Sequence, residues 1–418
     1  MKQNILVRGA RQLLTLHGPS GPRRGAALNN LGLIEDGAVL VVNGVISSVG
    51  PSRRVENLAE ARNALEMNAS GRVVMPGLID SHTYLISGPP LLDDIRSPGL
   101  TETQQILAAV RLVRSAPART LEFQARRILQ ACARHGTTSL ESKSGYGLDD
   151  SSELKILRVL AEIDKNPINV VATYFGAHIM PPEFNHNRGG YLEWVRETFL
   201  PKVAARKLAR FACALCSPAG FSIDEARGYL QAARRLGLIP KVHAEQTSQS
   251  GGTRLAVETE AASADGLNYA TSEDADLLAR SNVIATVLPA DYRQGVADRP
   301  APARLLIDHG AALAIATGFH HGKMPGYNMQ HAASIACKDL KLTAAEAISA
   351  STINGAHAIR SDGRCGSLQF GKDADLIILN VADYREISYY SGVNLVSATM
   401  RRGEVIYQES EVTWEAKK

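Results

Sequence analysis

The sequence has few cysteines, and their number is odd. The five are Cys132, Cys213, Cys216, Cys337 and Cys365. Five cysteines scattered over 418 residues favour free thiols and a reducing compartment over a disulfide framework. Cys213 and Cys216 have Cys-x-x-Cys spacing, but no second pair follows. On a strand these two side chains would point to opposite faces, so we expect neither a zinc site nor a redox pair there.

The sequence also lacks an excess of either charge and any long apolar run. Its 46 Lys and Arg residues are interspersed with 42 Asp and Glu residues, for a net charge of +4. This balance gives no basic patch, so a nucleic-acid partner is not expected. The first residues contain no apolar signal segment, and no stretch reaches transmembrane length. We therefore expect a cytoplasmic protein with no membrane partner.

Between residues 73 and 355, apolar strand-like segments alternate with helical patterns, which indicates parallel α/β units. Eight such segments can be counted. They end near residues 82, 141, 175, 216, 245, 267, 289 and 318. Eight units predict a (β/α)8 TIM-type barrel, in which polar residues at the carboxyl ends of the strands form the active site.

Both ends of the chain instead have the pattern of short β-strands. Near the start, Asn43-Gly44 separates two apolar segments as a two-residue hairpin turn does. Near the end, residues 374–379 read as a strand, and residues 396–407 read as a hairpin. We expect residues 1–72 and 356–418 to form one small composite β-sandwich, with the barrel domain of residues 73–355 inserted between them.

The first barrel segment is the most informative part of the sequence. Residues 73–84 pass from an apolar run through Pro76-Gly77 into Asp-Ser-His-Thr-Tyr. His82 and Tyr84 are two residues apart, so on a strand they face the same side. This places both at the predicted barrel mouth.

This segment resembles the first strand of the amidohydrolase superfamily, which reads Pro-Gly-x-x-Asp-x-His-x-His. The run Lys143-Ser-Gly-Tyr-Gly-Leu148, Gly176-Ala-His178 and His243-Ala-Glu-Gln246 are similar to the imidazolonepropionase-like branch. The resemblance covers nearly the whole chain. It implies a barrel enzyme, a homodimer, and one metal ion held by two histidines of strand one, a histidine of strand five and an aspartate of strand eight.

Only part of that ligand set is present. His82 and His243 match the family, whereas Tyr84 replaces the second histidine and Gly318 replaces the aspartate. Gly266 occupies the position of the family's strand-six catalytic histidine, and Ser217 occupies the position of an acidic residue. The family's substrate-binding arginine is missing. A catalytic zinc takes at least three protein ligands plus a water, so two histidines predict a lost metal site.

The remaining candidates follow from these positions. His243 and Glu245 share strand parity and are predicted as an acid/base pair. Tyr84 is predicted to act as an acid or hydrogen-bond donor, and His178 resembles a family substrate-binding histidine. The expected catalytic residues are His243, Tyr84, His178, His82, Glu245, His320 and His321, with Tyr146, Lys143 and Gln246 binding substrate. Lys143 has a structural alternative, since it could pair with Glu141.

Three functions stay open. The first is metal-independent acid/base chemistry (cyclisation, dehydration, isomerisation or ring opening) on a small polar or nitrogen-heterocyclic molecule, with no cofactor. The second is a cyclic-amide hydrolase in which His320 and His321 join His82 and His243 to rebuild a zinc or iron site. The third is a non-catalytic protein that binds a ligand.

Overall fold

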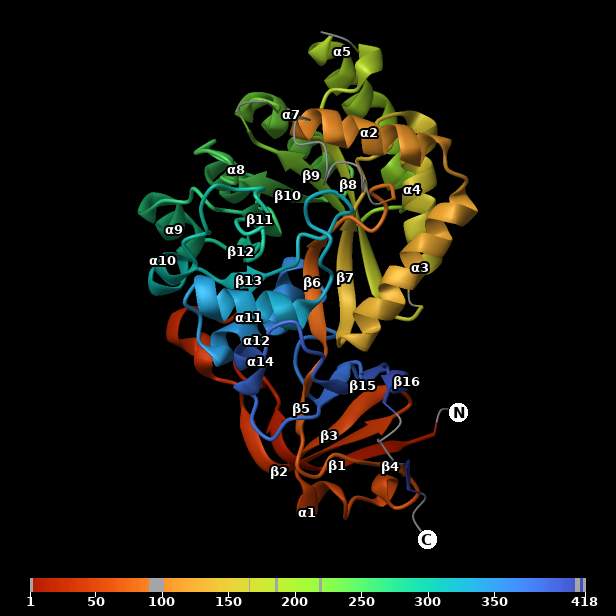
Figure 1. Ribbon diagram of the computed structural model, residues 1–418, viewed down its shortest axis with the longest axis vertical. Coiled ribbons are helices and arrows are strands. Elements are labelled where there is room, and N and C mark those ends of the chain that lie inside the picture. The colour runs from red at the N-terminus through yellow and green to blue at the C-terminus, as the bar shows by residue number, and fades with distance from the viewer. Residues whose placement is uncertain are drawn as a thin grey trace.

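The chain folds into a barrel module stacked along the long axis of the molecule on a sheet module (Figure 1). This is a computed structural model, which describes residues 3–89, 101–164, 166–184, 187–217, 220–409 and 414–415. Both termini lie at the sheet end, far from the opposite end of the barrel (Figure 1). The described helices are all too short or too polar to cross a lipid bilayer.

Eight parallel strands form the barrel sheet in sequence order, each paired with its sequence neighbours. They are β6 (Leu78–Thr83), β7 (Thr137–Lys143), β8 (Asn169–Ala177), β9 (Phe211–Leu215), β10 (Ile239–Ala244), β11 (Ser263–Gly266), β12 (Ile284–Val287) and β13 (Leu313–Ile315). All eight are almost entirely buried, as expected for parallel strands covered by helices. The predicted (β/α)8 fold is confirmed, strand by strand.

Side-chain and main-chain hydrogen bonds join the first and last barrel strands at their carboxyl ends. Asp80 accepts hydrogen bonds from the backbone N–H of Thr317 at 3.0 Å and from its hydroxyl at 2.6 Å. The backbone N–H of Gly318 donates to His82 O at 3.1 Å. Burial raises the pKa of Asp80 to about 7, and the Thr317 hydrogen bonds oppose that rise. These bonds hold the carboxyl ends of β6 and β13 together.

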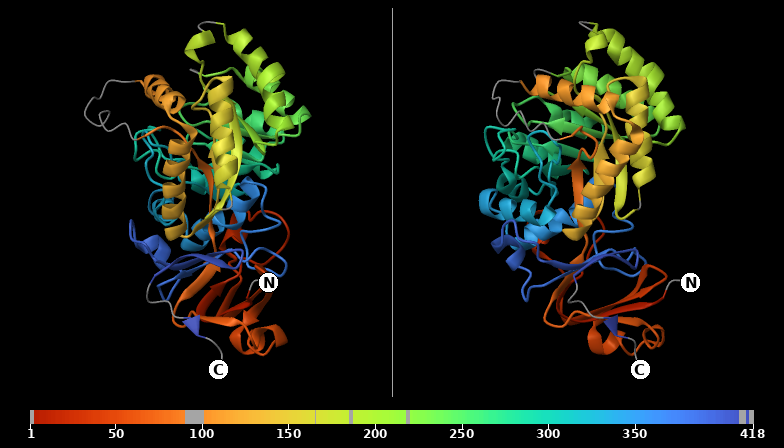
Figure 2. Two further views of the ribbon diagram at one scale, coloured as in Figure 1. Left: turned by 90° about the vertical axis from the view of Figure 1, so that its right-hand side faces the viewer. Right: turned by 45° about the vertical axis from the view of Figure 1, so that its right-hand side comes forward.

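Helices surround the barrel and cover one of its ends (Figures 1 and 2). Along the first half of the barrel they are α2 (Glu102–Ser115), α3 (Ala118–Arg134), α4 (Asp150–Ile163), α5 (Arg188–Glu193), α6 (Leu200–Ala205) and α7 (Ile223–Arg235). Along the second half they are α8 (Gly252–Glu258), α9 (Ser272–Ala279), α10 (Ala303–Asp308), α11 (Met329–Asp339), α12 (Ala344–Ser351) and α13 (Ile353–Ala358). The helix α2, which the sequence pattern did not reveal, crosses the far end of the barrel (Figure 1).

The start of α4 is fixed by two acidic residues. The helix begins at Asp150, and the cap is Asp149, whose carboxylate accepts from the backbone N–H of Ser152 at 2.7 Å. Glu153 is buried and accepts from the backbone N–H groups of Gly147 and Leu148 at 2.6 and 3.0 Å. This residue therefore fixes the loop after β7, which borders the pocket.

The two ends of the chain combine into one module, as predicted, in which a single mixed sheet is hydrogen-bonded throughout. Its strands are β1 (Ile5–Leu14), β2 (Leu33–Val42), β3 (Val45–Pro51), β4 (Leu65–Asn68), β5 (Val73–Pro76), β14 (Leu376–Leu379), β15 (Val396–Arg401), β16 (Glu404–Gln408) and β17 (Trp414–Glu415). Two short helices accompany it, α1 (Ser52–Val55) and α14 (Glu386–Tyr389). Figure 1 shows β15 and β16 from the chain end beside strands from its start.

The apolar run of residues 73–84 is two strands rather than one. β5 pairs with β1 and β14 in the terminal sheet, and the barrel begins at β6 after Gly77. The Asn43-Gly44 hairpin joins β2 to β3 as predicted, and the second hairpin joins β15 to β16.

Candidate active site

The candidate site is a pocket at the carboxyl ends of the barrel strands. It encloses about 940 Å³, part of which is open solvent at the mouth. Aromatic rings and imidazoles form much of its lining: His82, Tyr84, Tyr146, Phe175, His178, His243 and His320. Gln246 and Asp291 add polar groups, and Gln105, Ile106 and Ala109 of α2 also line it. Such a lining suits a small planar molecule with a few polar groups.

His82 lies at the bottom of this pocket in a fixed orientation. Its Nδ1 is 2.8 Å from Asp265 Oδ2, and both side chains are buried. Burial, and secondly the charge of Lys143, lower the pKa of His82 well below its ordinary value. The imidazole is therefore neutral and donates through Nδ1, which leaves Nε2 as the acceptor nitrogen.

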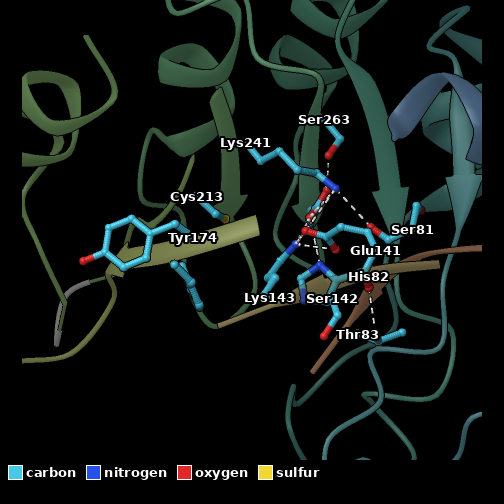
Figure 3. Close-up of polar contacts among 12 residues, drawn as sticks. Ser81, His82, Thr83, Glu141, Ser142, Lys143, Tyr174, Cys213, Lys241 and Ser263 are labelled. Atoms are coloured by element: carbon cyan, nitrogen blue, oxygen red, sulfur yellow. Dashed lines mark hydrogen bonds and ion pairs between the residues drawn. The ribbon is translucent and has the colours of Figure 1, made fainter. Parts of the chain in front are cut away.

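His82 adjoins a fully buried group of four charged side chains, three of which, Glu141, Lys143 and Lys241, are labelled in Figure 3. Lys143 Nζ is 2.6 and 2.8 Å from the two Glu141 oxygens and 3.3 Å from Asp265 Oδ2. Lys241 Nζ lies 3.7 Å from Glu141 and 3.8 Å from Asp265, and it donates to Ser81 O at 3.0 Å. Two cations thus balance two carboxylates inside the barrel.

The balance sets the charge states of the cluster. Burial alone would raise the pKa of Asp265, but Lys241, Lys143 and His82 hold it well below its usual range. Burial would lower the pKa of Lys143, but Glu141 and Asp265 outweigh it and raise that pKa. Asp265 and Lys143 are therefore charged near neutral pH, and Asp265 is an anion beside the neutral His82.

His243 and His178 present nitrogen atoms that lack partners among the described residues. The ring of His243 is 5.0 Å from that of His82, centroid to centroid, and its buried Nε2 has no hydrogen-bond partner. The ring of His178 stacks on Phe175 at 4.4 Å, and its buried Nδ1 also has no partner. Buried polar atoms normally have partners, so these two point to a ligand.

Burial also makes these imidazoles poor bases towards solvent. It lowers the pKa of His243 to about 4 and that of His178 to about 3. Because the pKa of His178 is lower in the folded chain than in the unfolded chain, the unfolded chain binds a proton first as pH falls. The associated stability is fully present above pH 6.5 and is lost as pH falls towards the pKa of the folded chain.

We therefore expect His178→Gln to reduce the acid sensitivity of folding. Between pH 6.5 and 5, the stability advantage of the wild-type histidine should fall by about 2 kcal/mol. Denaturant titrations of both proteins at several pH values measure this difference. The exposed His17→Gln is the control for loss of a histidine outside the pocket. An advantage that stays constant with pH would contradict a neutral, buried His178.

The Tyr84 ring contacts both imidazoles and other aromatic rings of the pocket. Its ring is 5.4 Å from His82, 5.9 Å from Tyr146 and 6.1 Å from His320. Burial raises the pKa of Tyr84 well above its ordinary value, so the phenol stays protonated. This favours a hydrogen-bond donor over a group that gives up its proton.

Only one of the two predicted loop histidines reaches the pocket. His320 lines it, and burial lowers its pKa to about 4, helped by the charges of His321 and Lys323. His321 turns aside: its Nδ1 lies 3.2 Å from Ser87 Oγ and its ring packs on Phe319 at 5.2 Å. The loop therefore supplies one imidazole and not the predicted pair.

Glu245 does not pair with His243. β10 ends at Ala244, and Glu245 has a φ of +51°, so the strand alternation used in the prediction stops before it. Its carboxylate accepts from the backbone N–H of Thr253 at 3.0 Å and from Ser250, at the start of α8. Glu245 thus fixes the loop after β10, and its side chain does not line the pocket.

Lys143 was predicted as a substrate contact, but it does not line the pocket. β7 continues through Lys143, and the side chain points into the barrel towards Glu141, which was the structural alternative. Tyr146 and Gln246, in contrast, line the pocket where substrate binding was predicted.

Gly266 and Gly318, at the family's catalytic-histidine and aspartate-ligand positions, both have positive φ angles, which glycine adopts without strain. Gly266 has a φ of +103°, and a Cβ there would lie 3.0 Å from Ala244 O and 3.2 Å from the His243 ring. Gly318 has a φ of +69°, and a Cβ would lie 3.3 Å from Leu288. At both positions a side chain would strain the backbone, and at 266 it would also lie against the backbone O of Ala244.

The residues present supply only two of the four metal ligands that the family resemblance implies. Within the described ranges, no group of three or more His, Cys, Asp and Glu side chains is arranged to bind a metal ion. His82 and His243 lie side by side, with ring centroids 5.0 Å apart, and each offers one ring nitrogen. Two nitrogen donors fall short of the three protein ligands of a catalytic zinc.

Sequence reasoning did not select Asp265, Lys241 or Asp291 as site residues. Asp265 lies within the short strand β11, and Lys241 is an inward-facing lysine in an apolar strand. Asp291 follows β12 by four residues. A charged residue within or just after a buried barrel strand was the available signal for all three.

The fold and this pocket at the strand ends define a barrel enzyme scaffold of the amidohydrolase type. The amidohydrolase family model matches residues 73–406, and the chain belongs to this family.

Two relatives resemble nearly the whole chain. An imidazolonepropionase of Geobacillus thermodenitrificans is 38% identical over 98% of this chain and 99% of its own length. An imidazolonepropionase of Alkaliphilus metalliredigens is 33% identical over 99% of this chain and 100% of its own. Among solved structures, a zinc-bound adenosine deaminase of Xanthomonas campestris is 18% identical, with a TM-score of 0.70 over 98% of this chain and 94% of that one. The last likeness supports the fold alone.

Proposed function

We propose that this chain is an enzyme that uses the amidohydrolase scaffold for metal-independent acid/base chemistry. Its substrate is a small polar or nitrogen-heterocyclic molecule, and the reaction is a cyclisation, dehydration, isomerisation or ring opening. The observation that carries the proposal is the arrangement of His82, oriented by Asp265, beside the unpartnered Nε2 of His243. Neutral imidazoles that line a pocket are suited to accept and return a proton.

The roles follow from the charge states. His243 accepts a proton from a substrate N–H or C–H, because its imidazole is neutral and Nε2 has no partner among the described residues. Tyr84 donates a hydrogen bond to the substrate oxygen on which negative charge develops. Asp265 is a positioning residue that keeps the His82 acceptor nitrogen available for a second proton.

The size of these effects limits the substrate. General acid–base catalysis contributes about 10²–10⁴-fold, which is too little for a stable amide. An activated carbonyl, an imine or an easily enolised ring is therefore a more suitable substrate than an unactivated amide bond.

The direct test measures zinc, iron and manganese per chain after purification without chelators, alongside turnover of a panel of lactams, imidazolones and amino ketones with and without EDTA. We expect far less than one metal ion per chain and turnover that EDTA leaves unchanged. About one equivalent of metal, with turnover abolished by EDTA, would overturn the proposal.

A second experiment asks whether the metal site is recoverable. Tyr84→His would place a third imidazole beside His82 and His243, and we expect it to bind Zn²⁺ measurably by calorimetry. Tyr84→Phe is the matched control and should not gain binding. Wild-type protein that binds Zn²⁺ as tightly as Tyr84→His would contradict a vacated site.

A metal-dependent hydrolase of a cyclic amide is the second candidate. It is favoured by the 38% identity to a protein named imidazolonepropionase over nearly the full length. It requires bound metal and EDTA-sensitive turnover, so the same experiment separates the two candidates. Protein that turns over nothing in the panel and yet binds panel members would favour the third candidate, a binding protein. A homodimer is part of the proposal and is measurable by light scattering.

A further inference from the structure

The pocket contains a buried carboxylate that the proposed acid/base chemistry does not use. Asp291 is 1% exposed and lines the pocket four residues after β12. Its Oδ1 accepts from Asn268 Nδ2 at 3.2 Å and from the backbone N–H of Tyr292 at 2.7 Å. Its Oδ2 is buried and has no hydrogen-bond partner among the described residues.

The charge of Asp291 has no cation beside it in the described part of the chain. The two arginines nearest in sequence are engaged elsewhere: Arg293 pairs with Asp339, and Arg299 stacks over the Tyr269 ring at 3.6 Å. Lys323 also lines the pocket, and it forms no ion pair with Asp291 among the described residues. A buried carboxylate with a free oxygen is costly unless a donor fills the position.

The surroundings of Asp291 hold its carboxylate in place. The backbone O of Asp291 accepts from Val296 N at 2.9 Å, and Asn268 also donates to Arg299 O at 2.8 Å. Gln246 and His243 line the same pocket as Asp291. Asp291 is therefore a rigid acceptor on the same pocket wall as the proposed base.

We propose that Asp291 anchors a positively charged nitrogen of the substrate, such as a protonated amine or amidine attached to a planar heterocycle. This deepens the proposed function, on which it rests, by naming the substrate class. The aromatic rings and unpartnered imidazole nitrogens receive the heterocycle, and the free Oδ2 of Asp291 receives the cation through a charge-assisted hydrogen bond. No arginine is among the described residues that line the pocket, so an anionic tail finds no bidentate partner there.

Three probes that share an imidazole ring test the charge preference: histamine with an ammonium tail, 4-ethylimidazole with an uncharged tail, and imidazole-4-propionate with a carboxylate tail. Calorimetric titrations are done at pH 8, because burial raises the pKa of Asp291 to about 6 and the group is ionised above that pH. We expect histamine to bind about 10- to 100-fold more tightly than 4-ethylimidazole, and the propionate to bind most weakly.

Asp291→Asn should remove the preference for histamine, since it keeps the shape and loses the charge. Asp298→Asn is the matched control: this exposed carboxylate on the same loop accepts from Tyr269 Oη at 2.7 Å and does not line the pocket. If Asp291→Asn fails to fold, Asp291→Ser provides the same comparison. Equal binding of the three probes, no binding of any, or a preference that survives in the Asp291 variants would overturn the proposal.

Failure of this inference and failure of the proposed function can be told apart. The probe titrations measure binding and do not require turnover, and the preference should persist in Tyr84→Phe. A histamine preference without metal-independent turnover would leave the anchor standing and reject the proposed chemistry. Metal-independent turnover without the preference would do the reverse.

Discussion

Lys143→Met is expected to lower the free energy of unfolding by about 3–5 kcal/mol, because it leaves the buried Glu141 without its closest cation. Both side chains have no exposed surface, so water cannot solvate the abandoned carboxylate. Denaturant titration followed by tryptophan fluorescence and by circular dichroism would measure the loss.

The control is Lys202→Met, which breaks an ion pair with Asp150 whose side chains are 40% and 41% exposed. Exposed pairs contribute about 0–1 kcal/mol, so this variant should be nearly neutral. Adding Glu141→Leu to Lys143→Met should recover part of the stability, because Lys241 and Asp265 then remain as a balanced pair. A loss under 1 kcal/mol for Lys143→Met would contradict the buried cluster as described.

His243→Asn is expected to lower kcat/KM by about 10²–10⁴-fold on the panel substrate that the wild-type enzyme turns over, because it removes the proposed base. The fold should persist, since asparagine fills less space and leaves no charge unpaired. His309→Asn, outside the pocket, is the control for loss of a histidine and should retain full activity.

The pH profile of kcat/KM checks the same assignment independently. The pKa of His243 is about 4, so its imidazole is neutral and competent at every pH well above that value. Activity should fall only as pH decreases through about 4, where the base becomes protonated. An acidic limb centred near the ordinary value of 6.5, or full activity in His243→Asn, would exclude His243 as the base.

The sequence was a good guide to the barrel because its strands are apolar runs with turn residues between them. Strand β10 could be placed to within one residue, and His243 and Gln246 at its end were selected correctly as positions near the pocket. Glu245 was misplaced because a single positive φ reverses the direction of its side chain. Residue spacing cannot reveal such a local change in backbone conformation.

The buried charge cluster was harder to predict for a different reason. Lys241 and Glu141 lie about 100 positions apart along the chain, and lysine is rarely fully buried without a partner. The pairing depends on which strands are neighbours across the barrel interior. Asp291 was missed for a related reason. It stands out only because its buried Oδ2 has no hydrogen-bond partner among the described residues, and a sequence does not show which atoms lack partners.

The pairing of β5 with β14 has a consequence for biosynthesis. β5 leaves the ribosome early, yet its partner β14 is made only after the entire barrel sequence. Until then one edge of β5 lies open, and an open strand edge favours association with other chains. The barrel can form while the terminal sheet is still incomplete, so that sheet is the last part to close. Chains terminated before β14 would keep this open edge of β5, whereas chains that include β14 can cover it.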